Sequence, residues 1–303
     1  MYLLIVALLE LIIFIRYVPF YATIIIGFFY LLWYFDGKEY TGERRWDAFR
    51  KLRIWKWLSP VDHVFPLKTD MSQTTGKKLL IFPNAQTPSA LIWGVGLHGG
   101  GTQFGSRAVH YVVPPIFMWV PIVRDVLMWS GAITYSLHNP ARSRLSVITR
   151  LLEDGRIVAY VPSNFYSILS PAFPGNVDIE LGSTSEYTFP NDAMLEYIVK
   201  EKVQVVPVFV QREEERYTIR MNGPKLQWVH SFTYMYLDYP FPMCYWYKLY
   251  HPTRPLPIVV SFGPIMSGEV YTDVDSLLRA LKEQVDRMAQ PILLESNKIV
   301  KGS

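Results

Sequence analysis

The stretch Lys77-Lys78-Leu79-Leu80-Ile81-Phe82-Pro83-Asn84-Ala85 decides the expected fold. Its apolar centre is short and is followed by a proline, which is typical of a buried strand that ends in a loop. Similar apolar runs occur at Ile157 to Val161, Val203 to Val210 and Leu256 to Phe262. These runs alternate with helical patterns. We therefore expect an α/β protein with a mixed sheet flanked by helices.

The helical patterns lie between these predicted strands and after the last one. Apolar residues recur at helical spacing in Ser143 to Asp154 and in Ala193 to Lys202. The last segment has the clearest pattern, at Leu277, Leu278, Leu281, Val285 and Met288. Thr272 and Asp275 before it have the spacing of a capping pair, so they predict where this helix begins.

The composition indicates a protein that works at a membrane. The chain has 303 residues, enough for one large domain or for one domain and an anchor. Half of its residues are hydrophobic and only 18% are charged, against about a quarter in an ordinary soluble domain. A net charge of +4 is too small to indicate a nucleic-acid partner. The single cysteine, Cys244, allows no internal disulfide framework and fits a cytosolic protein.

The N-terminal segment is the predicted anchor. Residues 2–35 carry two charges, Glu10 and Arg16, and divide near Pro19 into two apolar halves. Each half is shorter than the roughly 20 residues of a straight spanning helix. We expect a membrane-embedded helical hairpin; a single span from Tyr17 to Phe35 and a buried hairpin in a soluble fold are the alternatives. The first residues lack the basic start and small-residue cleavage site of a signal peptide.

The residues after the anchor predict its orientation. Lys and Arg exceed Asp and Glu over residues 38–56, as is usual on the cytosolic side of a membrane. No Asn begins a glycosylation acceptor. Arg45 to Leu58 resembles a short aromatic and basic helix of the headgroup layer. These patterns predict an anchor over residues 1–36 and a cytosolic α/β domain over residues 37–303.

Six short blocks, taken in order, resemble one family of lipid enzymes. They are Trp33-Tyr34-Phe35-Asp36, Arg44-Arg45-Trp46, Phe65-Pro66-Leu67, Arg124-Asp125-Val126-Leu127-Met128-Trp129-Ser130-Gly131, Val205-Val206-Pro207-Val208-Phe209 and Gly263-Pro264-Ile265. Their order resembles the type-2 diacylglycerol acyltransferase family, with the monoacylglycerol and wax-alcohol acyltransferases. This resemblance implies acyl transfer from acyl-CoA to an alcohol, at the endoplasmic reticulum membrane or on lipid droplets.

The resemblance fails where the chemistry of that family is carried out. Its His-Pro-His-Gly motif supplies a histidine that takes the proton of the acceptor hydroxyl. Phe82-Pro83-Asn84-Ala85 occupies that position, and neither Phe82 nor Asn84 can accept a proton near pH 7. A second family pattern, Gly-Gly-x-x-Glu, is replaced by the block from Pro162 and Ser163 to Tyr166. The resemblance therefore implies a catalytically impaired or inactive relative.

His98 is the candidate for a substitute base. It lies in His98-Gly99-Gly100-Gly101, a sequence found in esterase oxyanion holes, but the chain has no Gly-x-Ser-x-Gly nucleophile motif. A flexible loop is the simpler interpretation. The other five histidines are dispersed, without metal-ligand spacing and without a His-x4-Asp pattern.

The sequence thus predicts a membrane-bound acyltransferase-like protein of neutral-lipid metabolism that is impaired or inactive. Two alternatives stay open: an active acyl-CoA-dependent enzyme with a substitute base, and a lipid-binding or partner-regulating protein without turnover. We expect no bound cofactor and no metal, with acyl-CoA as the co-substrate of an active form. The expected partners are membrane lipid, an acyl-CoA or acylglycerol ligand, and a second copy or an active relative, but no nucleic acid.

Overall fold

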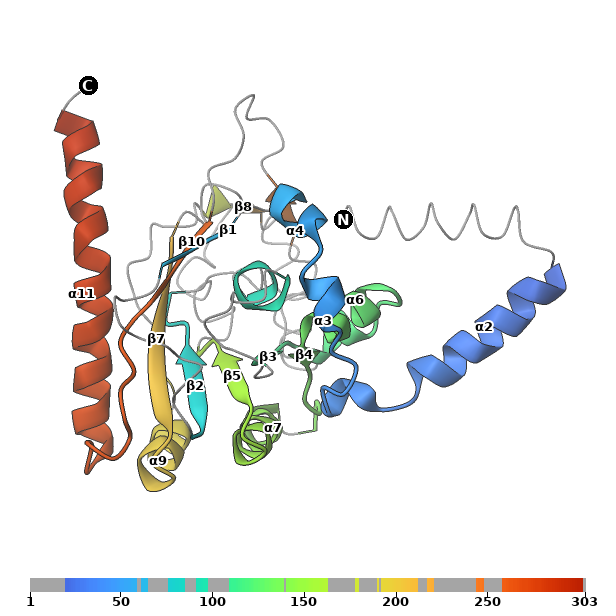
Figure 1. Ribbon diagram of the computed structural model, residues 1–303, viewed down its shortest axis with the longest axis horizontal. Coiled ribbons are helices and arrows are strands. Elements are labelled where there is room, and N and C mark those ends of the chain that lie inside the picture. Colours follow the sequence, from blue (N-terminus) through green and yellow to red (C-terminus); the bar gives the residue numbers. More distant parts are fainter. Residues whose placement is uncertain are drawn as a thin grey trace.

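The computed structural model describes residues 20–58, 61–64, 76–84, 91–97, 109–138, 140–162, 178–179, 190, 192–211, 217–220, 244–247 and 258–301. Figure 1 shows a central sheet between helices, with one N-terminal helix, α2, projecting away from the body. Of the predicted site residues, Ala85, His98, Ser163 and Tyr166 lie outside the described residues.

The described residues form one large mixed sheet and one small antiparallel sheet. The large sheet has seven strands in the order β1-β10-β7-β2-β5-β3-β4. Their bounds are β1 (Val61–Val64), β2 (Lys78–Ile81), β3 (Val109–Val112), β4 (Ala132–Ile133), β5 (Ile157–Tyr160), β7 (Gln204–Gln211) and β10 (Ile258–Phe262). The small sheet holds β6 (Asp178–Ile179), β8 (Tyr217–Arg220) and β9 (Cys244–Tyr247).

The direction of the strands makes the large sheet mixed. The five neighbours from β7 to β4 run parallel to one another. The strand β10 runs antiparallel to β7, and the edge strand β1 runs parallel to β10. A mixed sheet flanked by helices is what the alternation of strand and helix patterns predicted.

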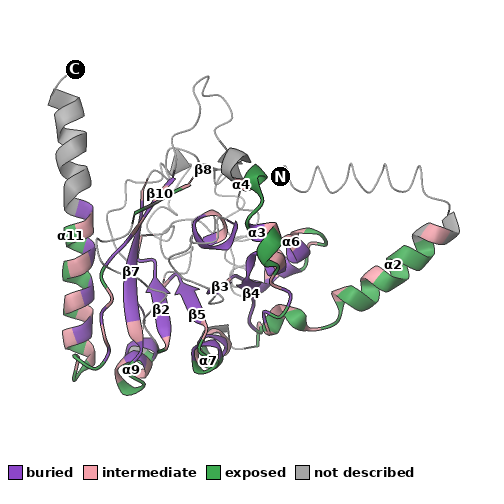
Figure 2. Cartoon of the chain, viewed as in Figure 1, coloured by how far each residue is buried: buried purple, intermediate pink, exposed green. Residues whose placement is uncertain are grey.

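Side chains of the central strands alternate between two hydrophobic cores. On β2, Leu80 joins the first core, whereas Leu79 and Ile81 join the second. The first core also contains residues of η2 (Ile92–Leu97) and α6 (Val123–Ser130); the second contains residues of α7 (Pro140–Glu153), α9 (Asp192–Lys200) and α11 (Val274–Lys301). Because both faces of the sheet are covered, its strands are continuous apolar runs. Figure 2 shows these strands buried.

The predicted helices and strands of the sheet layer are present, with one error at a helix start. The predicted capping pair of Thr272 and Asp275 is wrong. The N-terminal cap of α11 is Asp273, whose Oδ1 accepts a hydrogen bond of 2.7 Å from the backbone N–H of Ser276. Thr272 and Asp273 both have short polar side chains that suit an N-terminal cap, so the sequence alone does not choose between these two neighbours.

The segment between β3 and β4 contains three prolines and forms two short helices. After β3 come a 3-10 helix, η4 (Pro115–Met118), then α6 and the two-residue strand β4. Gly131 connects α6 to β4 with a φ of 101°. A Cβ atom at Gly131 would lie 2.8 Å from the carbonyl oxygen of Val109, so both the backbone angle and the space require glycine.

The N-terminal segment differs most from the prediction. It contains α2 (Phe20–Tyr34), η1 (Lys38–Tyr40), α3 (Asp47–Arg50) and α4 (Arg53–Leu58). The single helix predicted over Arg45 to Leu58 is therefore two short helices. Their aromatic rings pack on each other and on α6: the Phe49 ring centroid is 4.9 Å from that of Trp55 and 5.2 Å from that of Trp129.

The predicted membrane-embedded helical hairpin is wrong. Within the described residues, no helix combines the length and the apolar character needed to cross a bilayer. The helix α2 has 15 residues, about 22 Å at 1.5 Å per residue, and it continues into the α/β body through Asp36. Residues 1–19, which were to form the first half of the hairpin, lie outside the described residues. The division at residue 36 stays a prediction.

Candidate functional site

The carboxyl ends of β2 and β5 bring Phe82-Pro83-Asn84 and Pro162, the first residue of the second motif, to the same edge of the sheet. Leu80 lies opposite Ala159 of β5 and Val206 of β7, so Phe82-Pro83-Asn84 follows β2 beside the residues that come after β5, Val161 and Pro162. In the large sheet, β5 and β3 lie on one side of β2, and β7 and β10 lie on the other. The chain continues from β2 to β3 on the first side. Ligands of open α/β sheets bind outside the carboxyl ends of strands, where connections diverge in this way.

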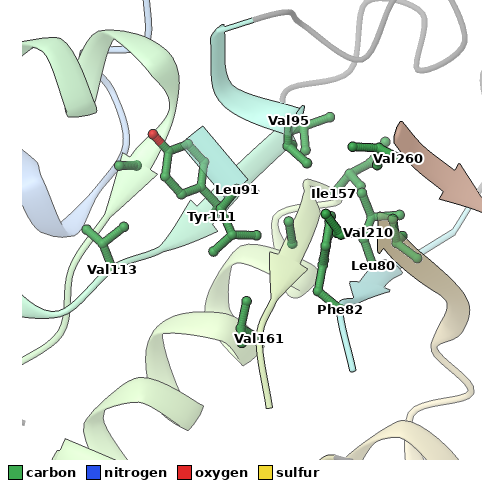
Figure 3. Close-up of a cluster of buried hydrophobic side chains, with 14 of the residues drawn as sticks. Leu80, Phe82, Leu91, Val95, Tyr111, Val113, Ile157, Val161, Val210 and Val260 are labelled. Atoms are coloured by element: carbon green, nitrogen blue, oxygen red, sulfur yellow. The ribbon is translucent and has the colours of Figure 1, made fainter. Parts of the chain in front are cut away.

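Phe82 is part of the core. Its backbone N–H donates a hydrogen bond of 3.0 Å to the carbonyl of Tyr160, which extends the pairing of β2 by one residue. Its side chain is fully buried in the first core, together with Leu80, Val161 and Val210 (Figure 3). The phenyl ring at the place expected for a catalytic residue therefore packs and does not face a ligand.

Asn84 uses its amide to join β2 to β7. Its Nδ2 donates a hydrogen bond of 2.6 Å to the carbonyl oxygen of Val210, and its Oδ1 accepts one of 3.0 Å from the backbone N–H of Val210. The side chain thus pairs with both backbone groups of one residue, as a strand neighbour would. Because an amide does not titrate near neutral pH, this arrangement holds the sheet edge and takes up no proton.

The described residues that directly follow β2, β3 and β5 at this edge offer no general base. Those that directly follow the parallel strands β2, β3 and β5 are Phe82, Pro83, Asn84, Val113, Pro114, Val161 and Pro162. None of these side chains binds or releases a proton near pH 7. His98, the predicted substitute base, lies outside the described residues and is not placed.

A network of ion pairs, buried at Arg44, Arg124 and Asp125, fixes the segment after α2 to α6; together with the side chains of α2 that bond to it, we call it the α2 anchor. It joins Asp36, Glu39, Arg44, Arg124 and Asp125. Nη2 of Arg124 lies 2.6 Å from a carboxylate oxygen of Glu39, and Arg44 pairs with both Asp36 and Asp125. Hydrogen bonds from Arg44 and the backbone amide of Lys38 hold the pKa of Asp36 below its usual value despite the opposing effect of burial.

Aromatic side chains of α2 complete this anchor. The hydroxyl of Tyr30 donates a hydrogen bond of 2.8 Å to Asp125, and the indole Nε1 of Trp33 donates one of 3.0 Å to the same carboxylate. The guanidinium of Arg44 lies 3.5 Å above the Trp33 ring. Burial and the Asp125 carboxylate raise the pKa of Tyr30 to about 12, so its hydroxyl stays a donor. These contacts fix the C-terminal half of α2 on α6.

Sequence reasoning missed the α2 anchor. It assigned Arg44 and Arg50 to an exposed cytosolic flank, but both are buried. The usable signal was the pair Arg124-Asp125 inside an apolar segment, because charged residues are rarely buried without partners. In the described part of the chain, no group of His, Cys, Asp or Glu side chains could hold a metal ion.

A second polar cluster surrounds His110 on β3. The ring Nδ1 lies 3.2 Å from the carbonyl oxygen of Gly131 and donates to it in the neutral tautomer, while Nε2 faces Nη1 of Arg156 at 3.5 Å. Burial, and then the nearby charges of Arg156 and Arg45, lower the pKa of His110 to about 3. The imidazole is therefore uncharged at neutral pH and lies between cationic side chains.

Comparison with known proteins does not assign a family. No family model matches the chain, and no curated protein matches it. One similar solved structure is the 1-acyl-sn-glycerophosphate acyltransferase PlsC from Thermotoga maritima. The TM-score is 0.41 at 12% identity, over 81% of this chain and 77% of that one. A likeness of this size supports no functional argument. No family model matches the chain, so the assignment to the type-2 diacylglycerol acyltransferases is wrong.

Proposed function

We propose that this chain is an acyltransferase-like protein of lipid metabolism that attaches to a lipid surface through α2 and is catalytically impaired or inactive. The observation that carries the proposal is the exposed apolar surface of α2 (Figure 2). Only the sequence supports the proposal that the bound lipid is an acyl donor or acceptor. The family named from the sequence is not part of the proposal.

The exposed surface of α2 is large and consists of aliphatic and aromatic side chains. Its members, each at least 47% exposed, are Ile24, Ile25, Ile26, Phe28, Phe29, Leu31 and Leu32. Contiguous apolar surface of this kind marks an interaction site in a folded protein. Trp46 and Tyr40, which are also exposed, follow in the chain. Aromatic rings close to arginines are typical of the lipid headgroup layer, which favours lipid as the partner.

The α2 anchor makes this surface effective. A helix joined to the body by a flexible linker would lose orientation when it met a lipid surface. Here Asp125 of α6 holds the C-terminal half of α2 through hydrogen bonds from Tyr30 and Trp33, and Arg124 pairs with Asp36 just after the helix. The body therefore keeps one orientation toward whatever surface α2 meets. A contact between α2 and a lipid surface accounts for both the exposure of its apolar side chains and its fixed attachment to the body.

The impairment follows from the edge formed by β2 and β5. Acyl transfer to an alcohol requires a group that takes the hydroxyl proton as the oxygen attacks the acyl carbon. At this edge Phe82 is buried and both polar ends of the Asn84 amide are bonded to Val210. An active enzyme that uses His98 as a substitute base is the second candidate, and a non-enzymatic regulator of an active relative is the third. The endoplasmic reticulum or lipid droplets, with a cytosolic body, is the proposed location.

Vesicle flotation tests the lipid surface. We expect the full chain to float with phosphatidylcholine vesicles. The double variant Ile25→Glu, Phe29→Glu should remain at the bottom, because these side chains are one helical turn apart on the exposed surface. Val270→Glu is the matched control, since Val270 is exposed on a loop far from α2 in sequence. Equal flotation of the double variant and the control would refute attachment through α2.

A turnover assay tests the chemistry. The protein purified in detergent is given labelled acyl-CoA with a monoacylglycerol, diacylglycerol or long-chain alcohol acceptor. We expect no transfer above a heat-killed sample. Transfer above that background would overturn the inactive form of the proposal, and its loss in His98→Ala would then identify the substitute base. Lipid that copurifies without turnover favours the regulator.

A further inference from the structure

Three arginines from separate segments converge beside His110. Arg156, just before β5, places Nη1 3.5 Å from Nε2 of His110 and 2.8 Å from the carbonyl of Thr41. Arg45 lies beside Gly131: its Cδ is 3.7 Å from the position that a Cβ atom would take on that glycine. The backbone carbonyl of that glycine holds the other nitrogen of His110. Arg50 of α3, which shares the Asp47 carboxylate with Arg45, completes the group, which we call the arginine cluster.

The arginine cluster has more positive charge than its neighbours balance. Its acidic partners are Asp47, 2.8 Å from Arg45, and Asp154, 3.9 Å from Arg156. Both carboxylates are more than half exposed, so water screens these pairs. Burial and the charge of Arg50 lower the pKa of Arg45 to about 10. Its buried Nε finds no hydrogen-bond acceptor among the described residues.

The members of the arginine cluster differ in their freedom to bind. Arg50 is committed, because its guanidinium donates to the carbonyls of Gly96 at 2.6 Å and Val95 at 2.9 Å. Arg45 and Arg156 are partly exposed, with 15% and 28% of their side chains accessible. An anion can therefore reach these two arginines from solvent, while Arg50 adds to the positive potential from within.

We propose that Arg45 and Arg156 form a binding site for a phosphate group. Guanidinium groups recognise phosphate through paired hydrogen bonds, and phosphate is the anion that several converging arginines suit best. The source is a phospholipid headgroup or a free phosphate compound, which share this chemistry. Trp46, exposed next to Arg45, adds an aromatic side chain of the type found in the headgroup layer. The lipid source rests on the proposed function; recognition of free phosphate does not.

Two probes test the site with the full chain. The first is inorganic phosphate, with the imidazole signals of His110 followed by NMR as phosphate is added. We expect phosphate to raise the pKa of His110, because the added negative charge offsets the neighbouring arginines. The second probe is flotation with phosphatidylcholine vesicles with and without phosphatidic acid. We expect stronger binding when phosphatidic acid is present.

Paired variants identify the residues. Arg45→Gln with Arg156→Gln should weaken the preference for phosphatidic acid by at least about fivefold. Arg279→Gln with Arg287→Gln removes two arginines of α11 and is the matched control for net charge. Arg45→Lys with Arg156→Lys keeps the charge and loses the paired hydrogen bonds, so it should fall between the two. Circular dichroism shows whether each variant is folded. If the Arg45→Gln, Arg156→Gln variant does not fold, the effect of phosphate on the pKa of His110 in the wild type tests the site instead.

The outcomes separate this inference from the proposed function. A phosphate effect on His110 without a vesicle preference supports the site with free phosphate as its source. A preference for phosphatidic acid that the first pair abolishes supports the headgroup. Binding to neutral vesicles with neither effect leaves the proposed function intact and overturns the site. Equal losses in the first pair and the control pair also overturn it, whereas a phosphate effect without any vesicle binding overturns the proposed function alone.

Discussion

His110 should make the stability of this protein depend on pH in a direction that can be calculated. The ring is buried between cationic side chains, and its pKa is lowered from 6.5 to about 3. As the pH falls below 6.5, the unfolded chain takes up a proton that the folded protein does not. The unfolded state is then favoured, so stability present above pH 6.5 is lost as the pH falls toward 3. Between pH 7 and pH 5 this amounts to about 2 kcal/mol.

Denaturant unfolding of wild type and His110→Gln at a series of pH values measures this contribution. The variant has no imidazole at this position, so its free energy of unfolding should fall by about 2 kcal/mol less over the same pH range. Carboxylates and other histidines titrate in both proteins and cancel in the comparison. The reasoning is refuted if the two proteins lose stability in parallel, or if NMR titration of folded wild type finds His110 protonating near pH 6.5.

Four further substitutions, at three positions, test packing and pairing that the structure shows. Asp125→Asn removes a carboxylate of the α2 anchor, so the buried charge of Arg124 keeps less compensation. We expect the free energy of unfolding, measured by heat or denaturant, to fall by about 3 kcal/mol. A fall of less than about 1 kcal/mol would contradict a buried network. Asn84→Ala removes both bonds to Val210 and should cost about 1–3 kcal/mol. Asn84→Asp should cost more, since a carboxylate faces the carbonyl oxygen; a milder effect of Asp would refute the two-bond geometry. Gly131→Ala forces a Cβ into a positive φ and against a backbone oxygen, so it should lower stability by more than about 1 kcal/mol, as differential scanning calorimetry can measure.

The regular core of this fold was predictable because its signals are local. The apolar runs around β2, β5 and β7 bury both faces, and the helix α11 repeats its apolar residues at helical spacing. These patterns depend on neighbours in the chain. The order of the strands does not, since β2 lies between strands that come much later in the sequence.

The polar sites were not predictable because they join distant residues. Arg44 meets Asp125 across 81 residues, and Asn84 meets Val210 across 126. The composition correctly indicated that the N-terminal segment is apolar. It also led to the wrong prediction of a helical hairpin, because a low charge does not indicate how long a helix is. The sequence shows that Asn84 cannot take up a proton near pH 7, whereas its structural role depends on a partner that only the fold supplies.

The pairing of Asn84 with Val210 also limits how this sheet edge can change. A side chain that bonds to the N–H and the carbonyl of one residue must present an acceptor and a donor side by side, as an amide does. The two nitrogens of a histidine lie on opposite sides of its ring and cannot serve both groups. Installing a base at this position would therefore break the rung between β2 and β7 before any chemistry could be gained. The contact that stabilises this edge therefore also restricts position 84 to a side chain that takes up no proton near pH 7.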